Sequence, residues 1–260
     1  MNDPKTESGR SPNNEPLPEE DKVFAAPKPR VDDFSFNTEV TAVFDDMVSR
    51  SVPFYAEIQR MTAELAVDFA SPGTNVYDLG CSTCNPFLGM KTMLAPGTDV
   101  RFVGVDSSPE MLDKGRRKLE AAGFGFPYDL RAEDLNRGVE ITNASVVMMV
   151  LTLQFIRPLY RERLLRSIHA GLAEGGCFLV VEKVLGENST FNRLFIKHYY
   201  ELKARNGYSE MEIAQKREAL ENVLVPYRLE ENRELLLEVG FRHVDVFFKW
   251  YNFCGIIATK

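Results

Sequence analysis

Short apolar runs alternate with amphipathic segments through the middle of this chain. The runs are residues 74–79, 100–105, 128–132, 145–151 and 178–181. The segments between them, which carry apolar residues at helical spacing, are residues 86–94, 109–122 and 160–172. Strands that are apolar on both faces are typical of a parallel sheet with helices packed on both sides. The pattern therefore predicts an α/β fold with a mostly parallel sheet.

This alternation ends after residue 182. Beyond it, the pattern predicts three helices, at residues 190–206, 209–221 and 230–239. It also predicts two closing strands, at residues 244–251 and 255–259, which bring the expected sheet to seven strands. The first two of these helices interrupt the sheet, so we expect a helical insertion at about 187–228 before the last two strands.

The chain before residue 34 has a different composition. Six of the fourteen prolines fall within residues 1–30, which hold almost no large apolar side chains. Such a segment buries too little surface to offset the entropy that is lost on ordering. We therefore predict a disordered tail over residues 1–33 and one folded domain over residues 34–260. That domain is expected to begin with a partly helical stretch at 35–57 and a helix at 55–69.

The overall composition is that of an ordinary globular protein, with 44% apolar and 27% charged residues. Its 31 basic and 38 acidic residues give a net charge of −7, which offers no reason to expect a nucleic acid as the main ligand. Four cysteines are too few for a disulfide scaffold in 260 residues.

Neither a secretory segment nor a membrane segment is expected. The residues after Met1 lack the basic and apolar regions of a signal peptide. The longest apolar stretch, residues 146–156, is interrupted by Thr152 and Gln154 and is too short to span a bilayer. The expected location is the cytoplasm.

Acidic residues mark the ends of three successive apolar runs. The first run ends in Asp78-Leu79-Gly80-Cys81-Ser82, where a glycine lets the backbone approach a ligand and the next helix offers free N–H groups. Asp106 ends the second run, where a carboxylate suits a ribose diol, and Asp134 ends the third, where an adenine amino group can be met. Ligands of such folds bind at the carboxyl ends of the strands. The pattern therefore favours a pocket for S-adenosylmethionine, an adenosyl ligand without phosphates.

Other interpretations of these residues are weaker but stay open. A dinucleotide or P-loop site would require G-x-G-x-x-G or G-x-x-x-x-G-K-[ST], and the turn at Gly80 matches neither motif. Asp106 and Asp134 also fit a purely structural role as helix caps.

Three further groups of residues carry less specific signals. Cys81 and Cys84 have the spacing of a redox or metal pair, but there is no second pair, so we expect two small residues packing a turn and no metal. His198-Tyr199-Tyr200 falls in the predicted insertion and lines a substrate pocket or lies at the surface. Arg217 lies in the same insertion and has two interpretations: it binds a carboxylate through two parallel hydrogen bonds, or it is an ordinary surface residue. Spacing alone favours the surface residue.

The chain resembles the carboxy-S-adenosylmethionine synthase family over most of residues 34–260. The shared motifs in and near the predicted sheet are Arg50-Ser51-Val52-Pro53 with Tyr55, Tyr77-Asp78-Leu79-Gly80-Cys81-Ser82, Asp106-Ser107-Ser108-Pro109, Asn143-Ala144-Ser145 and Thr152-Leu153-Gln154-Phe155. The more specific motifs lie in the predicted insertion: Asn206-Gly207-Tyr208-Ser209-Glu210, Gln215-Lys216-Arg217 and Leu220-Glu221-Asn222-Val223.

This resemblance implies a Rossmann-like methyltransferase fold in an enzyme that does not methylate and is usually a homodimer. It implies that S-adenosyl-L-methionine and prephenate are converted to carboxy-S-adenosyl-L-methionine and phenylpyruvate. A separate enzyme would use the product to carboxymethylate the wobble uridine of tRNA. By the same resemblance, the residues in contact with the adenosyl ligand are Tyr55, Gly80, Cys81, Ser82, Asp106, Ser107, Asp134, Leu135 and Arg217. Arg217 would hold the added carboxylate, and no residue is assigned as a general acid or base.

Two alternatives to this function remain. An ordinary S-adenosylmethionine-dependent methyltransferase acting on a small molecule would use the same turn and acidic residues but would not need Arg217. The other alternative is a non-catalytic adenosyl-binding subunit. It is motivated by Val150, which stands where the family commonly has asparagine, and by Thr83-Cys84-Asn85-Pro86, which replaces the family's small residues after the turn.

Overall fold

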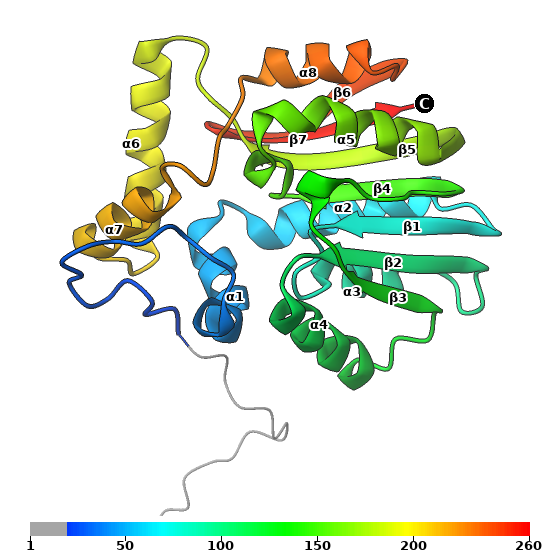
Figure 1. Ribbon diagram of the computed structural model, residues 1–260, viewed down its shortest axis with the longest axis horizontal. Helices are drawn as coiled ribbons and strands as arrows, with labels where there is room; N and C mark the ends of the chain where they lie inside the picture. Colours follow the sequence, from blue (N-terminus) through cyan, green and yellow to red (C-terminus); the bar gives the residue numbers. More distant parts are fainter. Residues whose placement is uncertain (1–19) are drawn as a thin grey trace, which may run out of the picture.

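A seven-stranded sheet crosses the computed structural model, which describes residues 20–260 (Figure 1). The strands are β1 (Thr74–Leu79), β2 (Val100–Asp106), β3 (Tyr128–Ala132), β4 (Ala144–Val150), β5 (Leu172–Lys183), β6 (His243–Trp250) and β7 (Phe253–Thr259). Their order in the sheet is β3-β2-β1-β4-β5-β7-β6. β7 is antiparallel to both of its neighbours, while the other neighbouring pairs are parallel. The predicted α/β fold with a mostly parallel sheet is confirmed.

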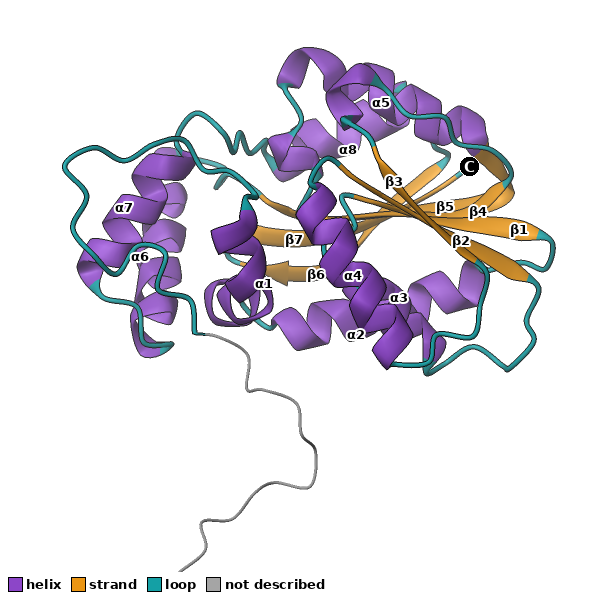
Figure 2. Cartoon of the chain, turned by 60° about the horizontal axis from the view of Figure 1, so that its bottom comes forward, coloured by secondary structure: helices purple, strands orange, loops and turns teal. Residues whose placement is uncertain are grey.

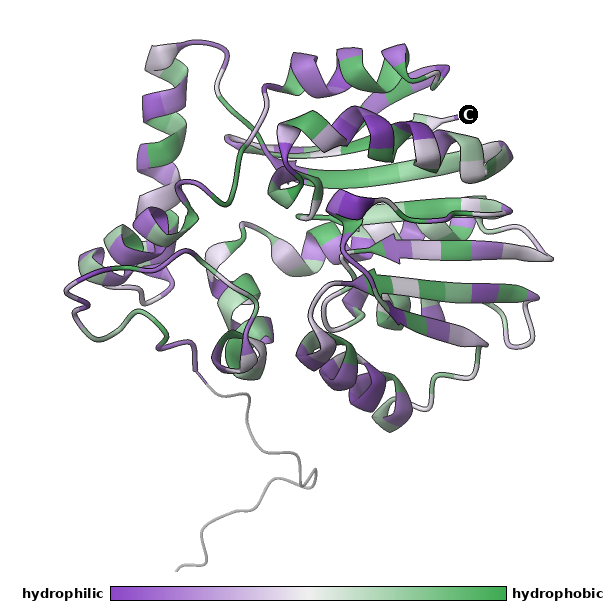
Figure 3. Cartoon of the chain, in the orientation of Figure 1, coloured by the Kyte–Doolittle hydropathy of each residue, from purple (hydrophilic) through white to green (hydrophobic). Residues whose placement is uncertain are grey.

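Helices cover both faces of this sheet (Figure 2). On one face lie α2 (Tyr55–Phe69), α3 (Asn85–Lys91) and α4 (Pro109–Ala121), and on the other lie α5 (Pro158–Gly171) and α8 (Leu229–Glu238). The central strands are therefore buried from both sides: residues 144–149 of β4 are all buried, and Figure 3 shows the apolar character of β4 and β5. No helix within residues 20–260 has both the length and the apolar composition needed to cross a bilayer.

Capping residues define where two helices near the carboxyl ends of the strands begin. Ser108 Oγ accepts a hydrogen bond from Met111 N at 3.2 Å, and Pro109 takes the first position of α4, where no backbone N–H is needed. Ser209 and Glu212 form a capping box at the start of α7 (Glu210–Leu220). These caps explain why the sequence predicts both helix starts to within one residue.

Three helices gather beyond the carboxyl ends of the parallel strands (Figure 1). They are α1 (Thr38–Ser51), α6 (Ser189–Arg205) and α7. The last two form the predicted insertion. A separate apolar core joins the three helices, with Phe44 and Met47 from α1, Tyr199 from α6 and Ala219 from α7. The helices therefore form a wall that faces the ends of the strands.

The first part of the described chain packs against this wall. Asp21, Val23 and Phe24 are buried. Tyr208 Oη donates a hydrogen bond to Asp21 Oδ2 at 2.6 Å, and Gln215 Nε2 donates to the carbonyl oxygen of Phe24 at 2.9 Å. The predicted domain boundary at residue 34 is therefore too late, because partners 187 to 191 residues away in the sequence order this segment. The predicted disorder of residues 1–19 lies outside the described residues.

Candidate active site

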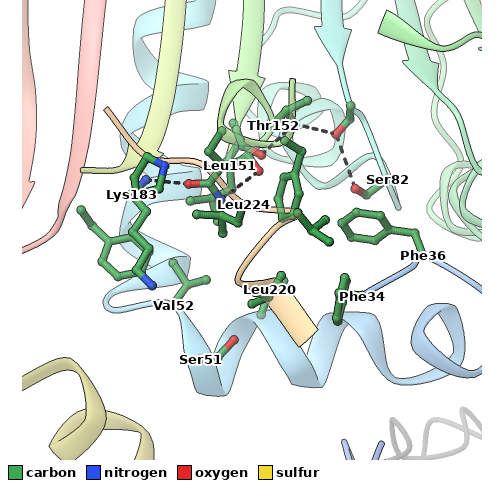
Figure 4. Close-up of a pocket in the computed structure, with 18 of the residues that line it drawn as sticks. Phe34, Phe36, Ser51, Val52, Ser82, Leu151, Thr152, Lys183, Leu220 and Leu224 are labelled. Atoms are coloured by element: carbon green, nitrogen blue, oxygen red, sulfur yellow. Dashed lines mark hydrogen bonds between the residues drawn. The ribbon is translucent and has the colours of Figure 1, made fainter. Parts of the chain in front are cut away.

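A cavity of about 540 Å³ lies between the carboxyl ends of the parallel strands and the wall of α1, α6 and α7 (Figure 4). This volume is in the usual range for sites that bind small molecules. All nine residues expected from the family resemblance line the cavity: Tyr55, Gly80, Cys81, Ser82, Asp106, Ser107, Asp134, Leu135 and Arg217. The fold thus brings them to one place, while their contacts with a ligand stay a prediction.

The turn after β1 packs closely against Thr152. Gly80 has a φ of +81°, a conformation that strains any residue with a side chain. A Cβ on Gly80 would lie 2.3 Å from Thr152 Cγ2. Ser82 Oγ donates a hydrogen bond to the Gly80 carbonyl oxygen at 3.4 Å, on the side of the cavity shown in Figure 4. Both the backbone conformation and the neighbouring side chain therefore require glycine at position 80.

Asp106 joins this turn to the start of α4. Its carboxylate accepts hydrogen bonds from the backbone N–H groups of Ser82 and Ser108, each at 2.9 Å. Burial raises the pKa of Asp106, and the hydrogen bonds to the carboxylate partly oppose that shift. Asp106 thus has a structural role of the kind that the sequence left open, and it also lines the cavity.

Asp134 differs from its predicted placement at the end of a strand. β3 ends at Ala132, and Asp134 instead caps the short helix η1 (Leu135–Arg137) by accepting a hydrogen bond from Asn136 N at 2.9 Å. Its side chain is 43% exposed and lies 3.6 Å from Arg137 Nε. The capping interpretation is therefore correct for this residue, which nevertheless lines the cavity.

Asp78 is a buried carboxyl group beneath the turn. The residue is among those that line the cavity, and it is 1% exposed. Neither carboxylate oxygen has a hydrogen-bond partner within residues 20–260. Burial, with a smaller contribution from the charge of Asp106, raises the pKa of Asp78 to about 8. The sequence placed Asp78 in the motif but did not predict this electrostatic state.

Replacing Asp78 by asparagine is expected to stabilise the protein by an amount that grows between about pH 4 and pH 8. The pKa of the folded carboxyl group is raised from 3.8 to about 8, so the wild-type protein loses stability as pH rises through this window. The loss is at most about 1.4 kcal/mol for each pH unit. Urea denaturation of both proteins across the window measures the effect. A stability difference that does not change with pH would contradict the raised pKa.

Tyr55 is held in place through Asn85. The Nδ2 atom of Asn85 donates to Tyr55 Oη at 3.1 Å and to Asp45 Oδ1 at 3.2 Å. Lys118 Nζ lies 3.0 Å from the same oxygen of Asp45. Burial tends to raise the pKa of Asp45, but Lys118 and the hydrogen bonds outweigh burial and lower it. Burial also raises the pKa of Tyr55 to about 12, so its hydroxyl group is neutral.

Cys81 and Cys84 fill space in the turn. Both are buried free thiols. Cys84 Sγ would lie 2.8 Å from a Cβ on Gly115, and Cys81 Sγ would lie 2.9 Å from a Cβ on Gly104, so each thiol occupies the space beside a glycine. Within the described chain, no cluster of three or more His, Cys, Asp or Glu residues could hold a metal ion. The contacts of both thiols fit the packing role that was expected of them.

Basic and aromatic side chains form the wall of the cavity opposite the turn. Lys183 at the end of β5, Tyr199 and Lys203 on α6 and Lys216 on α7 line this wall. Figure 4 shows Lys183 across the cavity from Ser82. The sequence does not identify Lys183 and Lys203 as site residues, because a lysine in a helix or at a strand end is usually a surface residue, and Lys216 stands out only within the motif that it shares with Arg217.

The sequence left open whether residues 198–200 line a substrate pocket or lie at the surface, and the structure shows both. Tyr199 and Tyr200 line the cavity. His198 lies at the surface, where its Nδ1 is 3.0 Å from Glu201 Oε2 and its ring stacks on Tyr251.

Arg217 lies in the last turn of α7 and lines the cavity. In the part of the chain that the structure describes, its guanidinium group has no hydrogen-bond or ion-pair partner, and the residue is exposed. A guanidinium group with free donors at a cavity wall suits a carboxylate, which it binds at two points. This position favours the carboxylate interpretation over that of an ordinary surface residue.

Comparison with known proteins identifies close relatives. Residues 76–176 match a family described as a methyltransferase domain. A carboxy-S-adenosyl-L-methionine synthase from Methylococcus capsulatus is 58% identical over 240 residues, which cover 92% of this chain and 99% of that protein. A protein of the same name from Desulfotalea psychrophila is 43% identical over 240 residues, which cover 92% of this chain and 97% of that protein.

Solved structures share the fold. An O-methyltransferase family protein from Burkholderia thailandensis matches 86% of this chain with a TM-score of 0.64 and 15% identity, and the match spans 60% of that protein. A SAM-dependent methyltransferase from Aquifex aeolicus matches 86% of this chain and 98% of its own length, with a TM-score of 0.56 and 13% identity. The expected Rossmann-like methyltransferase fold is therefore confirmed.

Proposed function

Because this chain belongs to the carboxy-S-adenosyl-L-methionine synthase family, we propose that it converts S-adenosyl-L-methionine and prephenate to carboxy-S-adenosyl-L-methionine and phenylpyruvate. The observation that carries the proposal is that one cavity contains both the turn after β1 and Arg217. The turn suits an adenosyl ligand, and the guanidinium group suits a carboxylate. A methyl donor has no carboxylate at its reacting end, whereas the carboxylated product does.

In this proposal, the ligand lies across the carboxyl ends of β1 and β2. The carboxylate of Asp106 accepts hydrogen bonds from the ribose hydroxyl groups, and Asp134 and Leu135 lie beside the adenine. Asp78 lies beneath the turn, where the positive charge of the ligand would lower the raised pKa of this carboxyl group and favour the carboxylate, which in turn stabilises the cation. The methyl end of the sulfonium then faces α7, which carries Arg217.

The chemistry needs no general base from the protein. Prephenate becomes aromatic by losing carbon dioxide and hydroxide, which leaves phenylpyruvate. The hydroxide takes a proton from the methyl group, whose C–H bonds the sulfonium polarises, and forms water. The resulting ylide carbon forms a bond to carbon dioxide and gives the carboxylated sulfonium. Atoms and charges balance, because the carboxyl group lost by prephenate is the one gained by the donor.

The protein contributes position and a dry environment to this reaction. Phe34, Phe36, Leu151 and Leu220 line the cavity beside the polar residues (Figure 4). Apolar walls exclude water, which keeps the ylide from being protonated before it meets carbon dioxide. Holding both substrates in one cavity also removes the entropic cost of bringing them together during the reaction.

Incubation of the purified protein with S-adenosyl-L-methionine and prephenate is expected to release phenylpyruvate and to form the carboxylated donor in equal amounts. Mass spectrometry of both products measures this directly, and omission of either substrate is the control. Phenylpyruvate formed without the carboxylated donor would show uncoupled breakdown of prephenate and would contradict the proposal.

The same assay separates the proposal from both alternatives, since neither of them consumes prephenate, and mass spectrometry of the copurifying ligand adds a second test. An ordinary methyltransferase would copurify with the unmodified donor or its demethylated product and would not consume prephenate. A non-catalytic subunit would bind the adenosyl ligand and turn over neither substrate. Val150, which motivates the second alternative, does line the cavity.

The proposal also covers partners and location, which rest on the family resemblance. We expect a homodimer in the cytoplasm whose product passes to a separate enzyme that carboxymethylates tRNA. We expect no direct contact with nucleic acid, in keeping with the net charge of −7.

A further inference from the structure

Three lysines from three different elements approach one another at the cavity wall. Lys203 on α6 is 4% exposed, and Lys216 on α7 is 6% exposed. Lys183, at the end of β5, and Lys203 both place their ammonium groups against the ring of Tyr199, with Nζ at 4.6 and 4.9 Å from its centroid. Burying like charges together is unfavourable unless anions neutralise them.

The protein supplies little negative charge to this cluster. Lys216 Nζ lies 3.7 Å from Asp21 Oδ2. Within residues 20–260, the ammonium groups of Lys183 and Lys203 have no carboxylate within ion-pair distance and no hydrogen-bond acceptor. Burial lowers the pKa of Lys183 to about 8. Burial, Lys216 and Lys183 together hold the pKa of Lys203 well below its usual range. A bound anion would neutralise these ammonium groups and so remove the cost of burying their charges together.

We propose that Lys183 and Lys203 form the site for the side-chain carboxylate of prephenate, the carboxylate that remains in phenylpyruvate. This inference rests on the proposed function. It divides the two carboxylates of the substrate between two places in one cavity. Arg217 holds the carboxyl group that is transferred, and the two lysines hold the one that stays. The ring of Tyr199, which both ammonium groups contact, then lies beside the apolar part of the substrate.

The variants Lys183→Met and Lys203→Met test this assignment. Methionine is apolar and of similar length, and replacing a buried lysine by an apolar residue does not by itself unfold a protein. Thermal unfolding of each variant checks that the fold is kept. Lys197→Met is the matched control, because Lys197 also lies on α6 but its side chain is 66% exposed.

Phenylpyruvate and prephenate are titrated calorimetrically into each protein after saturation with S-adenosylhomocysteine. We expect each lysine variant to bind both acids about tenfold or more weakly than wild type, as for loss of a charged hydrogen-bond donor. We expect the control to bind both as wild type does. We also expect affinity for S-adenosylhomocysteine to stay unchanged in all variants. Weaker binding of prephenate alone would place the lysines on the transferred carboxyl group and overturn the assignment.

Two further outcomes would also overturn it. Unchanged affinity for both acids would show that the lysines bind neither carboxylate. Weakened binding of S-adenosylhomocysteine itself would place them on the amino-acid end of the adenosyl ligand. These titrations measure binding, so they decide on the lysines even if the wild-type protein releases no phenylpyruvate, a result that would contradict the proposed function instead.

Discussion

Replacing Gly80 by alanine is expected to abolish binding of the adenosyl ligand and to lower the free energy of unfolding by about 3 kcal/mol. The φ of +81° costs an alanine about 1–2 kcal/mol. The new Cβ would also lie 2.3 Å from both Cγ2 and Oγ1 of Thr152, and crowding of this kind typically costs about 1–3 kcal/mol. Relief of the crowding requires the turn to move away from the cavity. Urea denaturation and titration with S-adenosylhomocysteine measure the two effects.

Gly97→Ala is the matched control for this prediction. Gly97 has the same φ of +81°, but a Cβ there would meet no heavy atom of the described chain within 4 Å. Its alanine variant is expected to lose only the backbone contribution, about 1–2 kcal/mol, and to bind the ligand normally. In a double variant, Thr152→Gly should recover part of the stability that Gly80→Ala loses. Equal losses for the two alanine variants would show that Thr152 does not constrain the turn.

Replacing Arg217 by alanine is expected to weaken binding of carboxy-S-adenosyl-L-methionine on the order of 100-fold while leaving the affinity for S-adenosyl-L-methionine within about twofold of wild type. Arg217 lines the cavity, and its guanidinium group has no partner among the described residues, so its loss leaves no protein group unpaired. The carboxylated ligand alone loses a charged, two-point contact. Calorimetric titration of both ligands measures the ratio of the two affinities.

Two other variants sharpen this result. Arg217→Lys keeps the charge but not the planar pair of donors, so we expect it to recover only part of the preference for the carboxylated ligand. Arg205→Ala removes an exposed arginine at the end of α6, away from the lining of the cavity, and should change neither affinity. If Arg217→Ala weakened the binding of both ligands equally, the guanidinium group would not be the group that binds the added carboxylate.

The central strands were predictable because burial on both faces leaves a continuous apolar run. β1 and β3 have the bounds that the sequence predicts, at residues 74–79 and 128–132. β5 is longer than its predicted core of residues 178–181, since Leu172 already pairs with Ala144 of β4. The intervening Glu174-Gly175-Gly176 has the composition of a loop. Residues 173–176 have no partner in either neighbouring strand, and regular pairing resumes at Cys177, so the first part of β5 is recognisable only from the pairing of Leu172.

The two walls of the cavity differ in how well the sequence predicts them. Gly80 and Asp106 are predictable from local sequence, because each directly follows or ends a short apolar run. Lys183 and Lys203 share no such pattern, because they meet only when β5 and α6 fold together. The proline-rich sequence around Asp21 predicts disorder, although the residue is buried and contacts Lys216 and Tyr208. Contacts between distant segments, which single-sequence patterns do not contain, decide all three positions.

The contacts of residues 21–28 affect the order in which parts of the protein fold during translation. Lys28 N donates a hydrogen bond to Gln215 Oε1, 187 residues later, beside the helix turn that carries Arg217. On the ribosome, the strands β1 to β4 emerge long before α7 is synthesised. The nascent chain can therefore form the side of the cavity that the strands build before it forms the side that α7 builds. Phe24 and Lys28 can form their hydrogen bonds with Gln215 only after α7 has been synthesised.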